Sequence, residues 1–287
     1  MTTQSAYALS RPAHVGAASL VVSDLPMVSS FYQQILGLSV LEKSGSEVLL
    51  GVDEKPLLRL VTDRAVRAGS HSAAGLFHNA FLLPSRQDLA LWLRHVAHQG
   101  QRLDGASDHI VSEAIYLSDP EGNGIEVYAD RPHETWRFDR DGMVTMATKR
   151  LDLQALYDSA GSSPWEAAPE GTALGHIHLQ VGDVPEAERF YSDVLGLKIM
   201  ARYPGASFFA TGSYHHHVAA NIWNSRGAGK RDETMTGLSS YELKFNDRDA
   251  YEEALTALDR LSIATERRSD GVFLRDPWGI GIVLNLS

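Results

Sequence analysis

The chain has 287 residues, 44% of them hydrophobic and 22% charged, which suits about two packed globular domains rather than a disordered chain. Its 36 acidic residues outnumber its 26 lysines and arginines, and the net charge of −10 disfavours binding to nucleic acid or to an anionic membrane. With no cysteine, disulfides, iron–sulfur clusters and thiol nucleophiles are excluded, and any metal must use histidine, aspartate or glutamate. The sequence shows neither a membrane-length apolar run nor the features of a signal peptide, so we expect a cytoplasmic protein.

The first predicted elements are a β-rich stretch at residues 20–22 and a helix that follows it. Asp24 is placed to cap this helix, Pro26 lies in its first turn, and Gly37 is placed to end it. Apolar side chains recur between them at three- and four-residue spacing. A strand at residues 47–52 follows.

The same order of elements then recurs. Residues 77–83 read as a strand, residues 87–98 as a helix, and residues 114–117 and 124–128 as strands. Residues 10–130 therefore form two βαβββ modules.

The second half of the chain repeats the first. Residues 23–41, SDLPMVSSFYQQILGLSVL, match residues 182–200, GDVPEAERFYSDVLGLKIM, and residues 119–127 match residues 276–284. Between the repeats, residues 131–171 are rich in charge, Gly, Ser and Pro and read as a linker. We expect an α+β fold of four βαβββ modules in two tandem domains, at residues 10–130 and 172–287.

The repeated motifs H-x-x-L-x-V-x-D, F-Y-x-x-x-L-G-L and D-P-x-G-N-x-I-E resemble those of the vicinal oxygen chelate superfamily. This superfamily includes glyoxalase I, fosfomycin- and bleomycin-resistance proteins and extradiol dioxygenases. The stretches GLFHNAFLLPSRQDLALWLRHV, DHIVSEAIYLSDPEGNGIEVYADRP and YHHHVAANIW are more narrowly similar to catechol 2,3-dioxygenase-like members. The resemblance covers nearly the whole chain and implies glyoxalase-like domains whose modules pair to form a cup around a divalent metal.

The resemblance places three metal ligands in each cup, and their positions depend on which modules pair. If each half folds on itself, neither cup has a full set. If the middle modules pair with each other and the outer modules do the same, one cup holds His78, Glu126 and His176, and the other holds Ala17, Ser240 and Val283. We therefore expect this exchanged pairing, with one complete site. His178, on the same side of its strand as His176, is the alternative ligand or a residue of the substrate pocket.

Two histidines and one carboxylate form the facial triad typical of non-haem Fe(II) oxygenases, and Mn(II) is the alternative metal. The resemblance then implies an extradiol dioxygenase that uses O₂ to open catechol or a substituted catechol to a 2-hydroxymuconic semialdehyde type of product. The alternatives are a glyoxalase-type metal-dependent isomerase or transferase, and a non-catalytic protein that binds a flat small molecule. Exposed sheet edges in the superfamily make a homo-oligomer plausible.

Three further residues are implied as catalytic by the resemblance. In the run of histidines at residues 215–217, strand alternation would send His216 to one face and its neighbours to the other. The family motif selects His216 as the acid and base near the O₂ position, with His215 as the fallback and a pocket residue. Tyr116 would hydrogen-bond the substrate hydroxyl. His109 matches the family's D-H-x-V-S motif, although its interval to Tyr116 is two residues longer than usual.

Overall fold

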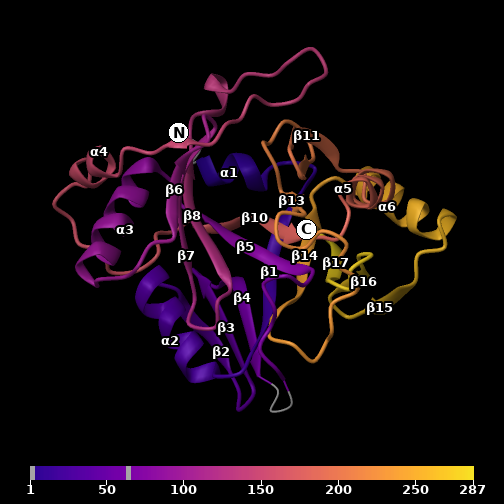
Figure 1. Cartoon of the computed structure of the whole chain (residues 1–287), viewed down its shortest axis with the longest axis horizontal. Helices are drawn as coiled ribbons and strands as arrows, with labels where there is room; N and C mark the ends of the chain where they lie inside the picture. The colour runs from indigo at the N-terminus through magenta and orange to yellow at the C-terminus, as the bar shows by residue number, and fades with distance from the viewer. Residues whose placement is uncertain (1–3, 63–65) are drawn as a thin grey trace.

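The computed structural model describes residues 4–62 and 66–287, and its strands form two large mixed sheets (Figure 1). The strands of the first sheet are β1 Ala13–Val22, β2 Ser39–Lys43, β3 Glu47–Val52, β4 Lys55–Thr62, β14 Gly237–Phe245, β15 Thr265–Arg268, β16 Gly271–Arg275 and β17 Gly281–Leu286. Those of the second are β5 Gly75–Leu82, β6 Gly105–Asp108, β7 Ser112–Ser118, β8 Gly124–Asp130, β9 Lys149–Arg150, β10 Ala173–Gln180, β11 Lys198–Tyr203, β12 Ala206–Ala210 and β13 Val218–Asn221.

Each sheet contains strands from both repeats. The first sheet has eight strands in the order β15-β16-β17-β14-β1-β4-β3-β2, and the second has nine in the order β11-β12-β13-β10-β5-β8-β7-β6-β9. Antiparallel pairs join the repeats, β1 with β14 in the first sheet and β10 with β5 in the second. The middle two modules therefore share one sheet and the outer two share the other, which confirms the exchanged pairing expected from the sequence.

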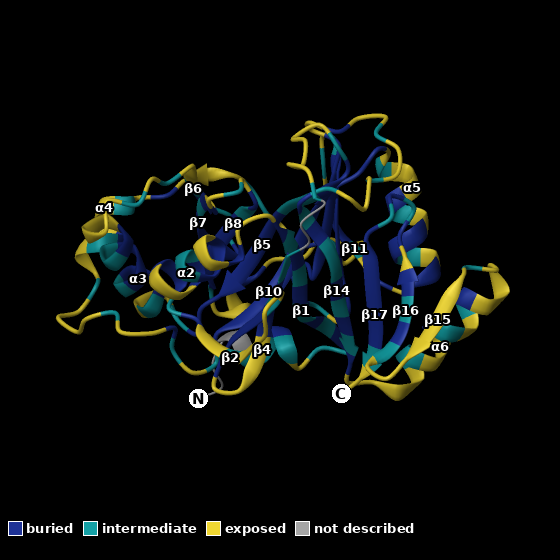
Figure 2. Ribbon diagram, turned by 90° about the horizontal axis from the view of Figure 1, so that it is seen from below, coloured by how far each residue is buried: buried dark blue, intermediate teal, exposed yellow. Residues whose placement is uncertain are grey.

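The helices are α1 Gln4–Leu9, α2 Leu25–Leu36, α3 Arg86–His98, α4 Leu153–Asp158, α5 Val184–Glu188 and α6 Arg248–Arg260, with a 3₁₀ turn at His133–Thr135. Helices α2, α3, α5 and α6 pack against strands, α4 packs on α3, and α1 contacts β1, β8 and β10. Helices α2 and α3 lie on one side of the molecule, whereas α5 and α6 lie on the other (Figure 1). The strands between them are largely buried, and the outward faces of the helices are exposed (Figure 2). No helix among the described residues is long and apolar enough to cross a membrane.

The first repeat helix is bounded by the capping residues that the sequence predicts. The carboxylate of Asp24 accepts a hydrogen bond from the backbone N–H of Met27 at 2.9 Å, and Gly37 ends the helix at a φ of 73°. The second repeat differs, because its helix passes from α5 into a π-helical turn at Arg189–Val194. The same sequence landmarks thus produce two helix geometries.

Residues 131–171, which read as a linker, take part in the fold. Strand β9 extends the second sheet beside β6, and α4 packs on α3. Trp136 and Leu156 are buried, and the N–H of Ala168 donates to the carbonyl of Gly37 at 3.0 Å. This segment therefore holds the second sheet and α2 together.

Candidate metal centre and pocket

His78, Glu126 and His176 lie on three neighbouring strands of the second sheet, β5, β8 and β10. Ala80 of β5 pairs in register with Glu126 on one side and with His176 on the other. Paired residues project to the same face of a sheet, and His78 projects there too because it is two residues before Ala80. The strand register thus gathers the three side chains above the small side chain of Ala80.

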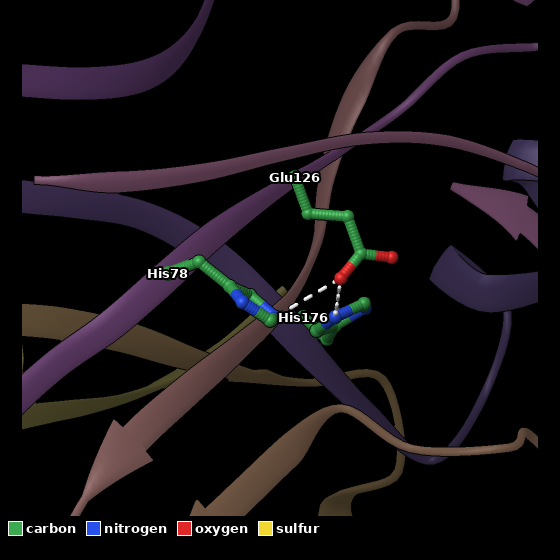
Figure 3. A group of neighbouring side chains, drawn as sticks. All are labelled: His78, Glu126 and His176. Atoms are coloured by element: carbon green, nitrogen blue, oxygen red, sulfur yellow. Dashed lines mark ion pairs between the residues drawn. The ribbon is translucent and has the colours of Figure 1, made fainter. Parts of the chain in front are cut away.

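The three side chains meet at one point (Figure 3). Oε2 of Glu126 lies 3.0 Å from Nε2 of His78 and 3.3 Å from Nε2 of His176, and the side-chain exposures are only 4%, 7% and 2% in that order. Among the described residues, this is the one group of three such side chains whose ligand atoms lie within 4.8 Å of one another.

The donor set fits a divalent metal. Both Nε2 atoms are buried and lack a well-directed hydrogen bond. Two ligands at about 2.1 Å from a metal and at right angles to each other are about 3 Å apart, which is close to the observed spacing. Burial lowers the pKa of His176 to about 4, so its ring is neutral at pH 7. Burial opposes ionisation of Glu126, but His176 and His78 hold its pKa well below the usual range. Neutral imidazoles and a carboxylate are the forms that bind metals.

A cavity of about 290 Å³ opens beside this group. Its walls come mainly from aromatic and apolar side chains, and its polar groups are mostly hydroxyls and imidazoles. The lining residues are Phe77, His78, Ser107, His109, Val111, Ser112, Tyr116, Glu126, Met146, Thr148, His178, Tyr203, Phe208, His216 and Trp223. Among these described residues there is no lysine or arginine, and Glu126 is the one carboxylate. The described lining therefore offers a small ligand apolar walls and hydrogen-bonding groups, with no lysine or arginine to pair with an anion.

Tyr116 and His109 meet at the cavity wall. Tyr116 of β7 pairs in register with Glu126, and its hydroxyl lies 2.7 Å from Nε2 of His109. Nδ1 of His109 lies 2.9 Å from the carbonyl of Ala147, which can only accept, so Nδ1 carries the proton. A neutral His109 then accepts from Tyr116. Burial raises the pKa of Tyr116 well above 10, and the nearby Glu126 adds to this, so the residue stays a phenol.

The longer interval between His109 and Tyr116 does not separate the two side chains. The intervening chain turns back at Ile110, which has a φ of 74°, and the side chain of Asp108 accepts from the N–H of Ile110 at 2.8 Å. With this turn in place, the two side chains remain in hydrogen-bond contact.

His178 lines the cavity but stands outside the donor group. It pairs in register with His78, so its side chain lies on the same face of the sheet. The amide Nδ2 of Asn221 lies 3.0 Å from Nε2 of His178 and donates to it. Since that nitrogen already has a partner, the geometry favours His176 over His178 as the ligand.

The expected strand alternation at residues 215–217 is wrong. Strand β13 begins only at Val218, and the three histidines lie in irregular backbone before it. His215 and His216 lie side by side, with their Nδ1 atoms 2.8 Å apart, rather than on opposite faces. His216 lines the cavity, and its ring centroid is 4.1 Å from that of His176. His215 stands behind it, away from the cavity lining, with Nε2 2.9 Å from Asp130.

Several residues of the site escaped the sequence reasoning. Met146 and Thr148 come from the segment that reads as a linker, and nothing in its composition marks them. Asp130 could have been found, because it lies four residues after Glu126 on β8, and strand alternation puts both side chains on one face. No sequence motif marks Phe77 and Trp223 as residues of the cavity wall.

Comparison with known proteins agrees with this fold. The model of the Glyoxalase/Bleomycin resistance protein/Dioxygenase superfamily matches residues 11–127 and 173–284. A protein of Bacillus subtilis (strain 168) named catechol-2,3-dioxygenase is 37% identical over 268 residues, covering 92% of this chain and 94% of its own.

Solved structures show the same architecture. A putative dioxygenase from Bacillus subtilis aligns with a TM-score of 0.66 at 12% identity, covering 95% of this chain and 84% of its own. Glyoxalase I from Zea mays aligns with a TM-score of 0.57 at 14% identity, covering 97% and 94%. The repeated modules, the exchanged sheets and the matches in both halves lead to one assignment: the chain belongs to the glyoxalase/bleomycin resistance protein/dioxygenase superfamily.

Proposed function

We propose that this protein is an extradiol dioxygenase that opens the ring of catechol or a substituted catechol beside its two hydroxyls, with Fe(II) held by His78, Glu126 and His176. The observation that carries the proposal is the buried group of two imidazoles and one carboxylate at the end of an aromatic cavity. The 37% identity to a protein named catechol-2,3-dioxygenase supports it.

The donor set explains why a metal would serve this reaction. A divalent metal held by His78, Glu126 and His176 would supply binding positions for a diol and O₂, two reactants that combine poorly on their own. Fe(II) and Mn(II) both accept these donors, and Fe(II) is the proposed metal because the two-histidine, one-carboxylate triad is typical of non-haem Fe(II) oxygenases.

The remaining residues hold the substrate and move protons. Tyr116 stays a phenol and stands next to Glu126, where it can orient a hydroxyl of the diol. His216 borders the same space beside His176, in a position to accept a proton from the substrate and return it to the opening ring. Phe77, Phe208 and Trp223 can enclose the flat ring and keep water away.

The test is to reconstitute the protein with Fe(II) without oxygen, add catechol, admit air, and follow O₂ uptake together with a yellow ring-opened product. We expect stoichiometric uptake and product. No uptake with catechol or with several substituted catechols would overturn the proposal. A glyoxalase-type isomerase would instead convert its own substrate without consuming O₂. A non-catalytic binding protein would bind its small molecule in the absence of metal.

Metal content tests the ligand set separately from activity. We expect His176→Ala to lose the bound iron, because one of the three donors is removed, whereas the matched variant His178→Ala keeps it. The opposite result would show that the ligand lies two residues further along β10.

A further inference from the structure

A chain of buried hydrogen bonds runs from the cavity to Asp130, and the proposed reaction assigns no role to most of its members. Nδ1 of His216 lies 2.8 Å from Nδ1 of His215, whose Nε2 lies 2.9 Å from Oδ1 of Asp130. The other oxygen of Asp130 accepts from the hydroxyl of Tyr214 at 2.9 Å, and that hydroxyl lies 2.9 Å from the hydroxyl of Tyr128. All five side chains are buried.

The carboxylate of Asp130 can only accept, so His215 carries a proton on Nε2 and donates it to Asp130. If this is the one proton on the His215 ring, its Nδ1 holds a lone pair, and the proton between the two rings belongs to Nδ1 of His216. That leaves Nε2 of His216 without a proton, and this residue lines the cavity.

We propose that Asp130 is a positioning residue which, through His215, fixes the tautomer of His216 so that Nε2 presents a lone pair to the substrate cavity. This inference rests on the proposed function in one respect, the task of the lone pair. In an extradiol dioxygenase the lone pair would accept a hydrogen bond from a diol hydroxyl and then its proton. Asp130 itself touches neither the cavity nor the three donors of the metal centre.

Both carboxylate oxygens of Asp130 have a hydrogen-bond donor: His215 donates to one and Tyr214 to the other. Tyr214 donates to Asp130 and therefore accepts from Tyr128. Burial and the nearby Asp130 raise the pKa of both hydroxyls well above the usual value for tyrosine, so both stay protonated. Gly175 makes room for this network, since a Cβ there would lie 2.0 Å from the hydroxyl of Tyr128. The glycine precedes His176 on β10, so the strand that supplies a metal donor also accommodates the hydrogen-bond chain.

The tautomer can be observed directly in the metal-free protein by ¹⁵N NMR of histidine-labelled samples, with the His216 signals assigned from a His216→Gln variant. We expect Nδ1 of His216 to be protonated and Nε2 to be bare. A proton on Nε2 of His216 in the wild type would overturn the proposal, whatever reaction the protein catalyses.

Kinetics of Asp130→Asn supply the second readout. An amide can donate as well as accept, so it no longer forces the tautomer of His215. We expect the variant to keep its iron content and its KM for catechol, and to lose kcat by about 10- to 100-fold, as is common when a supporting hydrogen bond is removed.

Asp276→Asn is the matched control. Asp276 is equally buried and also accepts from a tyrosine, Tyr191, at 3.1 Å, but it lies in the other repeat. We expect its kcat to match the wild type. If Asp130→Asn also keeps its kcat and the wild-type tautomer, Asp130 does not position His216. If no variant and no wild-type sample turns over catechol while the tautomer is as expected, the proposed function fails and the positioning role stands.

Discussion

At the scale of single residues, burial lowers the pKa of His176, His178 and His216 below the usual value for histidine and so favours their neutral rings. His217 shows this away from the metal centre: it is fully buried, its ring stacks on Tyr214 with centroids 4.7 Å apart, and burial lowers its pKa to about 3. In the unfolded chain a histidine binds a proton near pH 6.5. The unfolded state therefore binds more protons than the folded state between about pH 6.5 and 3, and stability falls as the pH falls through that range.

Replacing His217 should remove its share of this pH dependence. We expect His217→Asn to lose less stability per pH unit than the wild type between pH 6 and 5, with slopes that differ by about 1 kcal/mol per unit. Urea denaturation at several pH values measures both slopes. His71→Asn, at an exposed position, is the control and should keep the wild-type slope. Equal slopes for His217→Asn and the wild type would show that the pKa of His217 is not lowered in the folded protein.

The charge of the side chains that line the cavity should determine whether the protein prefers neutral or anionic substrates. Met146 lines the cavity, and the described lining contains no lysine or arginine. We expect Met146→Arg to raise kcat/KM for 3,4-dihydroxybenzoate relative to catechol by about tenfold, because a charge-assisted hydrogen bond to a carboxylate contributes about 1.5 kcal/mol or more. Competition assays with both diols measure the ratio, and Met146→Gln separates size from charge. An unchanged ratio would place Met146 outside the substrate's reach.

At the scale of secondary structure, the two repeat helices end at equivalent glycines in different surroundings. Gly37 and Gly196 have φ values of 73° and 72°, and each N–H donates to a carbonyl of the preceding turn at 3.1 Å. A Cβ on Gly37 would lie 2.5 Å from the backbone N of Ala168, whereas one on Gly196 would meet nothing within 4 Å. The linker segment therefore makes only the first helix end intolerant of a side chain.

Paired alanine variants test this difference. We expect Gly196→Ala to lower the free energy of unfolding by about 1 kcal/mol, the cost of a left-handed backbone for a residue with a Cβ. Gly37→Ala should cost more, because it must also displace residue 168 and weaken the hydrogen bond from Ala168 to Gly37. Chemical denaturation of both variants gives the two values. Equal losses would mean that the segment near Ala168 moves aside freely.

The limits of prediction from sequence are also clearest at this scale. The cap of α2 was predictable because Asp24, Pro26 and Gly37 act through local backbone chemistry. The π-helical turn of the second helix and the irregular backbone of residues 211–217 were not, because tertiary packing overrides the same local signals. The addition of β9 to the second sheet depends on a pairing with β6 about forty residues earlier, which no local pattern encodes.

At the scale of the whole molecule, the ligand positions implied by the family resemblance, together with completeness of the donor set, predicted which modules pair. The outer positions Ala17, Ser240 and Val283 offer no ligand, so only pairing of the middle modules assembles three donors, and the sheets have this topology. The position of the cavity walls was beyond such an argument. It depends on side chains from both repeats and from residues 131–171, which meet only in the folded chain.

The same exchange predicts that the two repeats unfold together. Each sheet takes strands from both repeats, and β1 packs against β10 where the sheets meet, so neither repeat can unfold without breaking both sheets. We expect Leu243→Ala, a buried change on β14 of the first sheet, to destabilise the chain by at least about 2 kcal/mol and to speed exchange of the slowest amides of β10 in the second sheet by about 30-fold. Hydrogen exchange followed by mass spectrometry measures both sheets in one experiment.

The control is Leu261→Ala, at a position that is 45% exposed, which should leave the stability and the exchange rates unchanged. If β14 exchanges faster while β10 keeps its protection, the sheets are separate cooperative units, and changes in the outer modules do not reach the candidate metal centre.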